Sequence, residues 1–145
     1  ILTMTIERIF IDKLFAAEAY TRTAEKEHRA FEASKHIYDL AVIASEPRIV
    51  SLLQDKEQLA KLLKIRLTEE QNRLDGIPGV LPKDFIFFEK ACTNTHITKA
   101  YTTMQNQYVF IPDDRISLDD AQYQLHCLQD QLNLNPAWSL TTIRE

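Results

Sequence analysis

The chain has 145 residues, of which 45% are hydrophobic and 26% are charged, and its formal net charge is −4. This composition suffices for one soluble domain with its own core, and no apolar run approaches the ~20 residues that a membrane helix needs. The acidic balance gives no general attraction to nucleic acid or to anionic lipid. With only two glycines, the chain cannot form a glycine-rich phosphate loop, a Rossmann turn or a nucleophile elbow.

The cysteines and the first residue bear on where the protein acts and whether the chain is whole. Cys92 and Cys127 form no metal-binding pattern, and a reduced pair predicts a cytoplasmic protein. A disulfide between them is the less favoured alternative. Because the chain opens on Ile1 and not on Met, we expect it to be a piece of a longer protein.

Apolar residues recur at helical spacing through the front half, residues 1–74. The helices expected there cover residues 5–22, 24–33, 35–45 and 48–74. Thr5 and Ser34 are the expected N-caps of the first and third helices. Glu46-Pro47 ends the third helix, since the residue before proline avoids helical geometry. The fourth helix is expected to break near Gln54-Asp55.

Residues 75–82 are the clearest loop, because they hold both glycines and two prolines. The elements expected in the back half, residues 83–135, are an aromatic patch at 84–88, a helix over 89–107, a short strand candidate at 108–111 and a last helix from about 118. Ser117 caps the last helix, Asn135-Pro136 ends it, and the tail over 136–145 is expected to be irregular. The sequence therefore predicts an all-α fold, a single domain built as a bundle of about five to seven helices.

Lys13 interrupts an apolar stripe on the first expected helix. It lies seven residues after Ile6 and four before Ala17, so helical geometry places it among the apolar positions. Two interpretations stay open: the side chain extends to a nearby helix edge, or it is held in place for its charge.

Asp39 is the only charge in the apolar segment over 37–44. A buried carboxylate is costly unless it is paired or bound to a metal, so either a structural ion pair or a functional site is indicated. Because Lys13 and Asp39 lie on neighbouring helices, both side chains can face one cleft.

Other polar residues carry weaker signals. The cluster of His28, Arg29, Lys35 and His36 suits either a solvated helix face, which is favoured, or contacts to phosphates. The remaining candidates, which we interpret as structural or as turn and helix-start acids, are His96, His126, Asp113-Asp114 and Asp119-Asp120. No metal-binding residues are therefore predicted in this chain.

Four segments resemble the C-terminal helical half of the AbiEii/AbiGii-type nucleotidyltransferase toxins. Residues 5–14, TIERIFIDKL, resemble that family's T-x-E-R-x-F-x-E-K-L helix, and residues 35–40, KHIYDL, resemble its basic residue followed by Y-D-L. Residues 100–104, AYTTM, and residues 117–120, SLDD, followed by a leucine helix, are similar to two later segments. The order agrees, and the resemblance covers residues 3 to about 135.

The resemblance implies a two-part enzyme. Its N-terminal α/β half carries a glycine-serine motif and paired metal-binding aspartates, and its helical half adds a lysine and an aspartate to the same cleft. Lys13 would then hold the triphosphate of an NTP, and Asp39 would act near the metal or the attacking hydroxyl as a base or an orienter. Lys35 and Arg29 would assist in binding the nucleotide. Mg²⁺ and NTP are implied for the intact protein, and neither is expected to bind this chain alone.

The chain also departs from the family pattern, because nothing in it resembles the glycine-serine motif or the D-x-D pair. We therefore expect a C-terminal fragment whose missing N-terminal domain is a partner. The intact bacterial protein would transfer a nucleotide from NTP to an acceptor such as RNA, in a toxin–antitoxin or phage-defence system with a cognate antitoxin. The alternative is a non-catalytic helical domain that binds a protein partner through its leucine faces.

Overall fold

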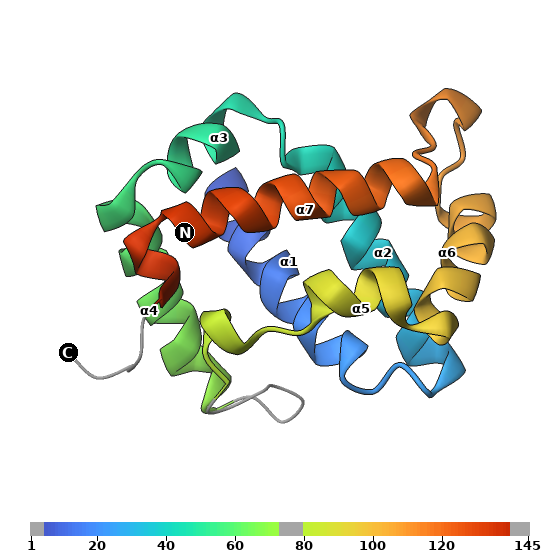
Figure 1. Ribbon diagram of the computed structural model, residues 1–145, viewed down its shortest axis with the longest axis horizontal. Coiled ribbons are helices and arrows are strands. Elements are labelled where there is room, and N and C mark those ends of the chain that lie inside the picture. Colours follow the sequence, from blue (N-terminus) through green and yellow to red (C-terminus); the bar gives the residue numbers. More distant parts are fainter. Residues whose placement is uncertain (1–4, 73–79, 140–145) are drawn as a thin grey trace.

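The computed structural model describes residues 5–72 and 80–139 (Figure 1). Within these ranges the chain forms seven α-helices, three short 3₁₀ helices and no β-strand, which confirms the predicted all-α class. The elements are α1 (Ile6–Thr21), α2 (Glu27–Ile43), α3 (Pro47–Leu53), α4 (Lys56–Glu70), η1 (Pro82–Asp84), α5 (Phe87–Thr93), α6 (Thr95–Tyr108), η2 (Pro112–Asp114), α7 (Leu118–Leu134) and η3 (Pro136–Ser139). No helix in the described ranges is both long and apolar enough to cross a membrane.

Side-chain caps fix where several of the helices begin. The Thr5 hydroxyl accepts a hydrogen bond from the Arg8 amide at 3.1 Å, and the Ser117 hydroxyl accepts one from the Asp120 amide at 3.1 Å. Both N-caps were predicted, and both are confirmed. Asp55 caps α4 in the same way, which confirms the break expected near residues 54–55.

Two predicted boundaries are wrong. Residues 27–43 form the single helix α2, although we expected two helices separated at Ser34. Ser34 is fully buried within α2, and its hydroxyl donates to the Phe31 carbonyl at 2.7 Å, so packing retains it inside the helix. Conversely, the single helix expected over 89–107 is divided at Asn94, whose side chain caps α6 by accepting from the Ile97 amide at 3.1 Å.

The segments after α6 and α7 also differ from expectation. The strand candidate at 108–111 forms no strand, because α6 continues to Tyr108 and residues 109–111 have no strand beside them within the described ranges. Residues 136–139 of the expected irregular tail form η3, and Trp138 in it is 3% exposed. The indole packs edge-on against Phe85, with ring centroids 5.6 Å apart, and this burial orders the segment. Residues 75–79 of the expected loop and residues 140–145 of the tail lie outside the described ranges.

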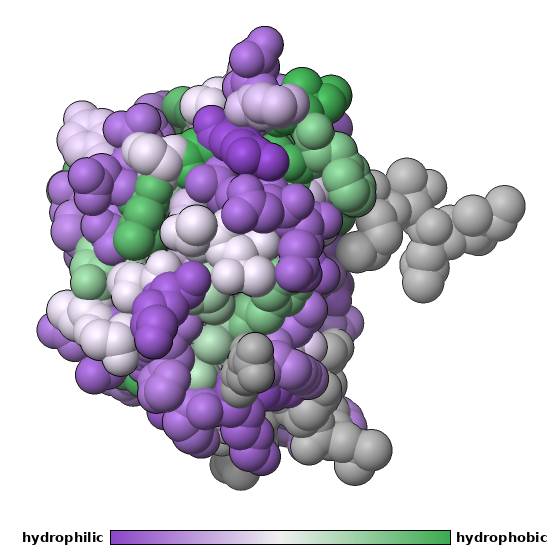
Figure 2. Space-filling view, turned by 90° about the vertical axis from the view of Figure 1, so that its right-hand side faces the viewer, coloured by the Kyte–Doolittle hydropathy of each residue, from purple (hydrophilic) through white to green (hydrophobic). Residues whose placement is uncertain are grey.

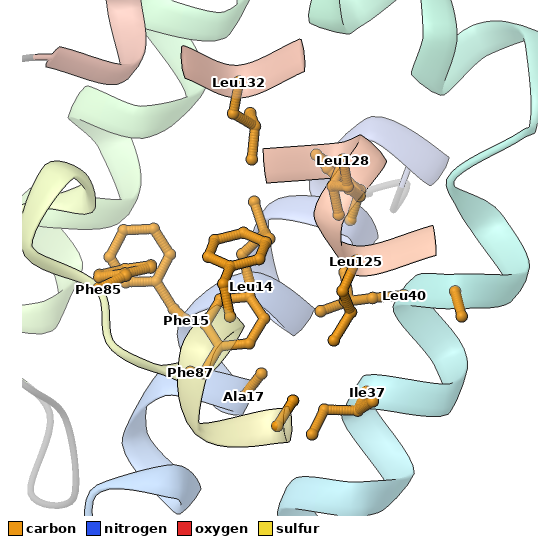
Figure 3. Packing of buried hydrophobic residues seen from close by; sticks show 14 of the residues in the cluster. Leu14, Phe15, Ala17, Ile37, Leu40, Phe85, Phe87, Leu125, Leu128 and Leu132 are labelled. Atoms are coloured by element: carbon orange, nitrogen blue, oxygen red, sulfur yellow. The ribbon is translucent and has the colours of Figure 1, made fainter. Parts of the chain in front are cut away.

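α1 lies at the centre of the bundle, in contact with α2, α3, α4 and α5, while α7 crosses in front of it in Figure 1. Figure 3 shows buried side chains from α1, α2, α7 and the segment around α5 meeting in one cluster, among them Leu14, Leu40, Phe87, Leu125 and Leu132. Each such side chain contributes about 1.5–3 kcal/mol when it leaves water. The cluster combines residues from both predicted halves, so α1 and α2 are held rigidly where they carry the candidate site.

Candidate functional site

Lys13 and Asp39 form an ion pair between α1 and α2. The Lys13 ammonium lies 2.8 Å from Oδ2 of Asp39, and the two side chains are 27% and 14% exposed. The pair forms because α1 and α2 pack against each other, and Lys13 on one helix and Asp39 on the other both lie where the two helices meet. The structure brings these two side chains together, whereas a shared cleft and their chemical roles stay predictions.

Tyr108, the last residue of α6, completes the surroundings of the carboxylate. Its hydroxyl lies 3.2 Å from Oδ1 and 3.3 Å from Oδ2 of Asp39, so it donates to both oxygens. The ring stands edge-on against Tyr38, whose own hydroxyl donates to the Asp114 carbonyl at 2.7 Å. Burial, followed by the negative charge of Asp39, raises the pKa of Tyr108, so its hydroxyl keeps its proton. The carboxylate of Asp39 on α2 therefore accepts from Lys13 of α1 and from Tyr108 of α6.

Lys35 lies on the outer side of this cluster. Its ammonium sits 5.1 Å from the centre of the Tyr108 ring, in a cation–π arrangement, and 3.4 Å from the Glu32 carboxylate. Lys35, a predicted nucleotide-binding residue, therefore contacts Tyr108, and Tyr108 in turn contacts Asp39. Its charge is partly balanced by Glu32, and a phosphate group would compete with that carboxylate for it.

Arg29 lies apart from the pair. It precedes Asp39 by ten residues on α2, about 15 Å along the helix axis. Its guanidinium covers the Tyr20 ring at 4.1 Å, and its Nε donates to the Thr23 hydroxyl at 2.7 Å. The structure therefore does not bring Arg29 into contact with Lys13 or Asp39.

His36 lies near both the Lys13–Asp39 pair and the contact between Arg29 and Tyr20. Its imidazole stacks on the Tyr20 ring, with the two ring centroids 5.6 Å apart. Burial, with a further contribution from the positive charge of Lys13, lowers the pKa of His36 to about 4, so the ring is neutral at pH 7. Its Nδ1 is buried without a hydrogen-bond partner among the described residues. A neutral ring here adds no charge that would repel Lys13.

A pocket of about 950 Å³ opens between α2 and α6, beside the cluster. We call it the α2–α6 groove and define it by His28 and Glu32 of α2 and by His96, Lys99, Thr103 and Gln107 of α6. Glu32 also contacts Lys35, and Gln107 directly precedes Tyr108, so the groove comes near these two residues of the cluster, whereas Lys13 and Asp39 are not among its lining residues. Its volume lies in the range of small-molecule sites.

The remaining candidates from the sequence are dispersed. Within residues 5–72 and 80–139, no three His, Cys, Asp or Glu side chains are placed to hold a metal ion. Cys92 and Cys127 are free thiols, and Cys92 Sγ lies 3.6 Å from Nε2 of His126, a contact between α5 and α7 that sequence reasoning missed. Another pocket, of about 670 Å³, includes Asp114 and Asp120 among its lining residues.

Sequence reasoning also missed the parts that Tyr108 and His36 play at the pair. Tyr108 is separated from Asp39 by 69 positions, and its place on a helix face gave no sign of its partner. His36 was grouped with a solvated charge cluster, yet it is half-buried against Tyr20. A signal did exist for His36, since it directly precedes the apolar segment that contains Asp39.

Comparison with known proteins gives the class of protein. Residues 1–129 match a family model of nucleotidyltransferases, described as the nucleotidyl transferase AbiEii toxin of a Type IV toxin–antitoxin system. Because the match covers most of the chain, the chain belongs to the AbiEii nucleotidyltransferase toxin family. No curated protein and no solved structure gave a significant match. The family inferred from residues 5–14 and 35–40 is thereby confirmed.

Proposed function

We propose that this chain is the helical half of a nucleotidyltransferase toxin, and that the intact protein transfers a nucleotide from NTP to an acceptor such as RNA. The observation that carries the proposal is the Lys13–Asp39 pair, 2.8 Å apart and partly exposed between α1 and α2. A base or orienter beside a phosphate-binding cation is what transfer of a nucleotide to a hydroxyl requires. The family match supports the same reaction class.

Lys13 has the properties of a residue that binds the triphosphate of an NTP. Its ammonium is a compact point charge, and its side chain is 27% exposed, so a phosphate oxygen can reach it. Binding there would exchange Asp39 for phosphate as the partner of Lys13. The carboxylate would then be free to accept the proton of an attacking hydroxyl. Lys35, on the other side of the Tyr108 ring from Asp39, would add positive charge near the same phosphates.

The residues that the structure describes do not bring together the ligands of a Mg²⁺ site. The two carboxylates of the cluster, those of Asp39 and Glu32, are each paired with a lysine, and no three potential ligands of the described residues come together. The chain also has no D-x-D pair. Any metal that the reaction uses would therefore need ligands from the proposed N-terminal nucleotidyltransferase domain.

Substitution of the pair tests the proposal. In the full-length protein, Lys13→Ala and Asp39→Asn are each expected to reduce nucleotide transfer and toxicity by about 10²-fold or more. The matched control is Lys61→Ala, which removes an exposed lysine of α4 and should leave both unchanged. Full activity of the Lys13→Ala protein would refute the role of the pair.

Membership in a toxin–antitoxin family supports a cognate antitoxin as a partner. We propose that the intact protein acts in the cytoplasm and that this antitoxin inhibits its activity. Expression of the full-length protein with and without a candidate antitoxin gene tests this. Growth arrest only in the absence of that gene is the expected result. Equal growth in both cases would argue against such a partner.

A non-catalytic interaction domain is the second candidate. Phe110 and Ile111, which come after α6, are 85% and 59% exposed, and exposed apolar side chains of this size suit a protein partner. In that case the charges of Lys13 and Asp39 are dispensable. A Lys13→Met/Asp39→Leu variant would then keep the biological effect, which the catalytic proposal forbids.

A further inference from the structure

Tyr108, the last residue of α6, has a ring and a hydroxyl with separate partners. The hydroxyl donates to Asp39 and lies 3.2 Å from Oδ1 and 3.3 Å from Oδ2. The ring stands edge-on to Tyr38, with the two centroids 6.2 Å apart, and the Lys35 ammonium lies 5.1 Å from its centre. Tyr108 is 38% exposed, and the side of the molecule on which α6 lies is largely hydrophilic (Figure 2). Removal of the hydroxyl alone would therefore leave the packing of the ring intact.

The two donors to Asp39 would respond differently to a bound nucleotide. Lys13, 2.8 Å from Oδ2, is the residue that the proposed function assigns to the triphosphate, so its ammonium would move toward the phosphates. Tyr108 carries no charge, because burial and then the negative charge of Asp39 raise the pKa of its hydroxyl, which keeps its proton. A triphosphate attracts a neutral phenol much less than an ammonium. The contact between Tyr108 and Asp39 would therefore persist when Lys13 changes partner.

No other donor from the described part of the chain is in place to take over from Lys13. Among the described residues, Asp39 accepts hydrogen bonds from Lys13 and Tyr108 only. The other charged or titratable groups around this carboxylate are carboxylates themselves, bond elsewhere or, in the case of the imidazole, stack on Tyr20. They are Glu32, Lys35, His36 and Tyr38 of α2 and Asp114 of η2. When Lys13 turns to a phosphate, the Tyr108 hydroxyl is therefore the donor that remains.

From these observations we infer that Tyr108 is a positioning residue, whose hydroxyl holds the Asp39 carboxylate in place once Lys13 has turned to the triphosphate. The inference rests on the proposed function and adds a residue to its site. In the transfer step, the acceptor oxygen bonds to the α-phosphorus of the NTP, the bond to the diphosphate oxygen breaks, and the hydroxyl proton passes to Asp39. Tyr108 keeps its own proton throughout. It acts through Asp39 alone, by fixing the direction in which the carboxylate meets the attacking hydroxyl.

Tyr108→Phe tests this role, because it removes the hydroxyl and keeps the ring between Tyr38 and Lys35. In the full-length protein, given a labelled NTP and RNA, kcat at pH 7 should fall about tenfold while KM for NTP stays near wild type. The acid limb of the kcat profile should move to higher pH by about half a unit, because a carboxylate with one donor fewer takes up a proton more readily. The profile of kcat/KM should move less, since Lys13 still pairs with Asp39 in the free protein.

The matched control is Tyr101→Phe on the same helix, which removes a hydroxyl that donates to the Ile116 carbonyl and not to Asp39. It should lower stability and leave kcat and both pH profiles unchanged. Unmoved profiles in Tyr108→Phe, together with loss of transfer in Lys13→Ala, would overturn the positioning role and keep the pair. A raised KM for NTP at unchanged kcat would make Tyr108 a nucleotide-binding residue and overturn it as well. Full transfer by Asp39→Asn, or no transfer by the wild-type protein, would overturn the proposed function itself.

Discussion

α1 carries two clusters of charge that differ in how completely they are satisfied. In the first, Arg66 of α4 is 5% exposed, and its Nε and Nη2 donate to Glu70 at 2.9 and 2.6 Å. Its Nη1 pairs with Asp12 of α1, which also accepts from Arg8 at 3.0 Å. Arg8 in turn pairs with Glu69. Every charge in this network has an opposite charge beside it, and the guanidinium also lies 5.2 Å from the centre of the Phe15 ring.

The second cluster, at the neighbouring position Lys13, is built differently. It uses a lysine where the first uses arginines, and it adds a long phenol contact where the first has short ion pairs. A pocket of about 950 Å³ lies near its outer residues Lys35 and Tyr108, and Nδ1 of the nearby His36 has no hydrogen-bond partner among the described residues. The comparison teaches that charge near a core is by itself no sign of function. The candidate site differs from the saturated network in its partly exposed lysine and in the long phenol contact to Asp39.

The largest expected effect breaks the saturated network. Arg66→Ala removes the buried guanidinium that pairs with both Glu70 and Asp12, and it should lower the free energy of unfolding by about 3–5 kcal/mol. Lys13→Ala, whose partner Asp39 keeps access to water, should cost no more than about 1 kcal/mol. Urea denaturation monitored by circular dichroism measures both. Equal losses in the two variants would remove the structural distinction between the clusters.

A smaller effect concerns acid and the buried imidazole. The pKa of His36 is about 4 in the folded protein against 6.5 as its ordinary value. The unfolded chain therefore takes up a proton first, so the contribution of His36 to stability is complete above pH 6.5 and is lost as the pH falls toward 4. At pH 5 the loss should be about 1–2 kcal/mol.

His36→Phe should remove this acid sensitivity while keeping a ring against Tyr20. The measurement is urea denaturation at pH 7 and at pH 5. His28→Phe, which replaces an exposed imidazole on the same helix, is the control and should keep the wild-type response. If the His36→Phe protein loses as much stability in acid as wild type, another group is responsible.

Local signals predicted much of the fold. The caps at Thr5 and Ser117 and the break before Asp55 depend on residues within one turn of each boundary, and all three are present. Ser34 was wrongly predicted to be an N-cap, because serine is common at helix starts. Inside α2 its hydroxyl instead donates to the Phe31 carbonyl one turn earlier. Asn94 was missed for the converse reason, since the apolar spacing continues across the break.

The site was predictable only in part, for a related reason. Helical periodicity identified Lys13 and Asp39, because a charge in an apolar stripe is visible in one sequence. The third member, Tyr108, comes from α6 and meets Asp39 only through tertiary packing. Arg29 was grouped with Lys35 by proximity in sequence, yet it lies about three helical turns from Asp39 on α2. Spacing thus located the pair but not the side chains that surround it.

The smallest expected effect compares two tyrosines of α6. Tyr101 is 1% exposed, and its hydroxyl donates to the Ile116 carbonyl at 2.8 Å, whereas Tyr108 is 38% exposed and holds Asp39 only through long contacts. Tyr101→Phe should therefore cost about 1–2 kcal/mol of unfolding free energy, and Tyr108→Phe no more than about 0.5 kcal/mol. Urea denaturation of both variants measures the difference. A larger loss in Tyr108→Phe would mean that the phenol is a structural bond, and Tyr108 would then belong with the saturated network and not with a site that a ligand hydroxyl can enter.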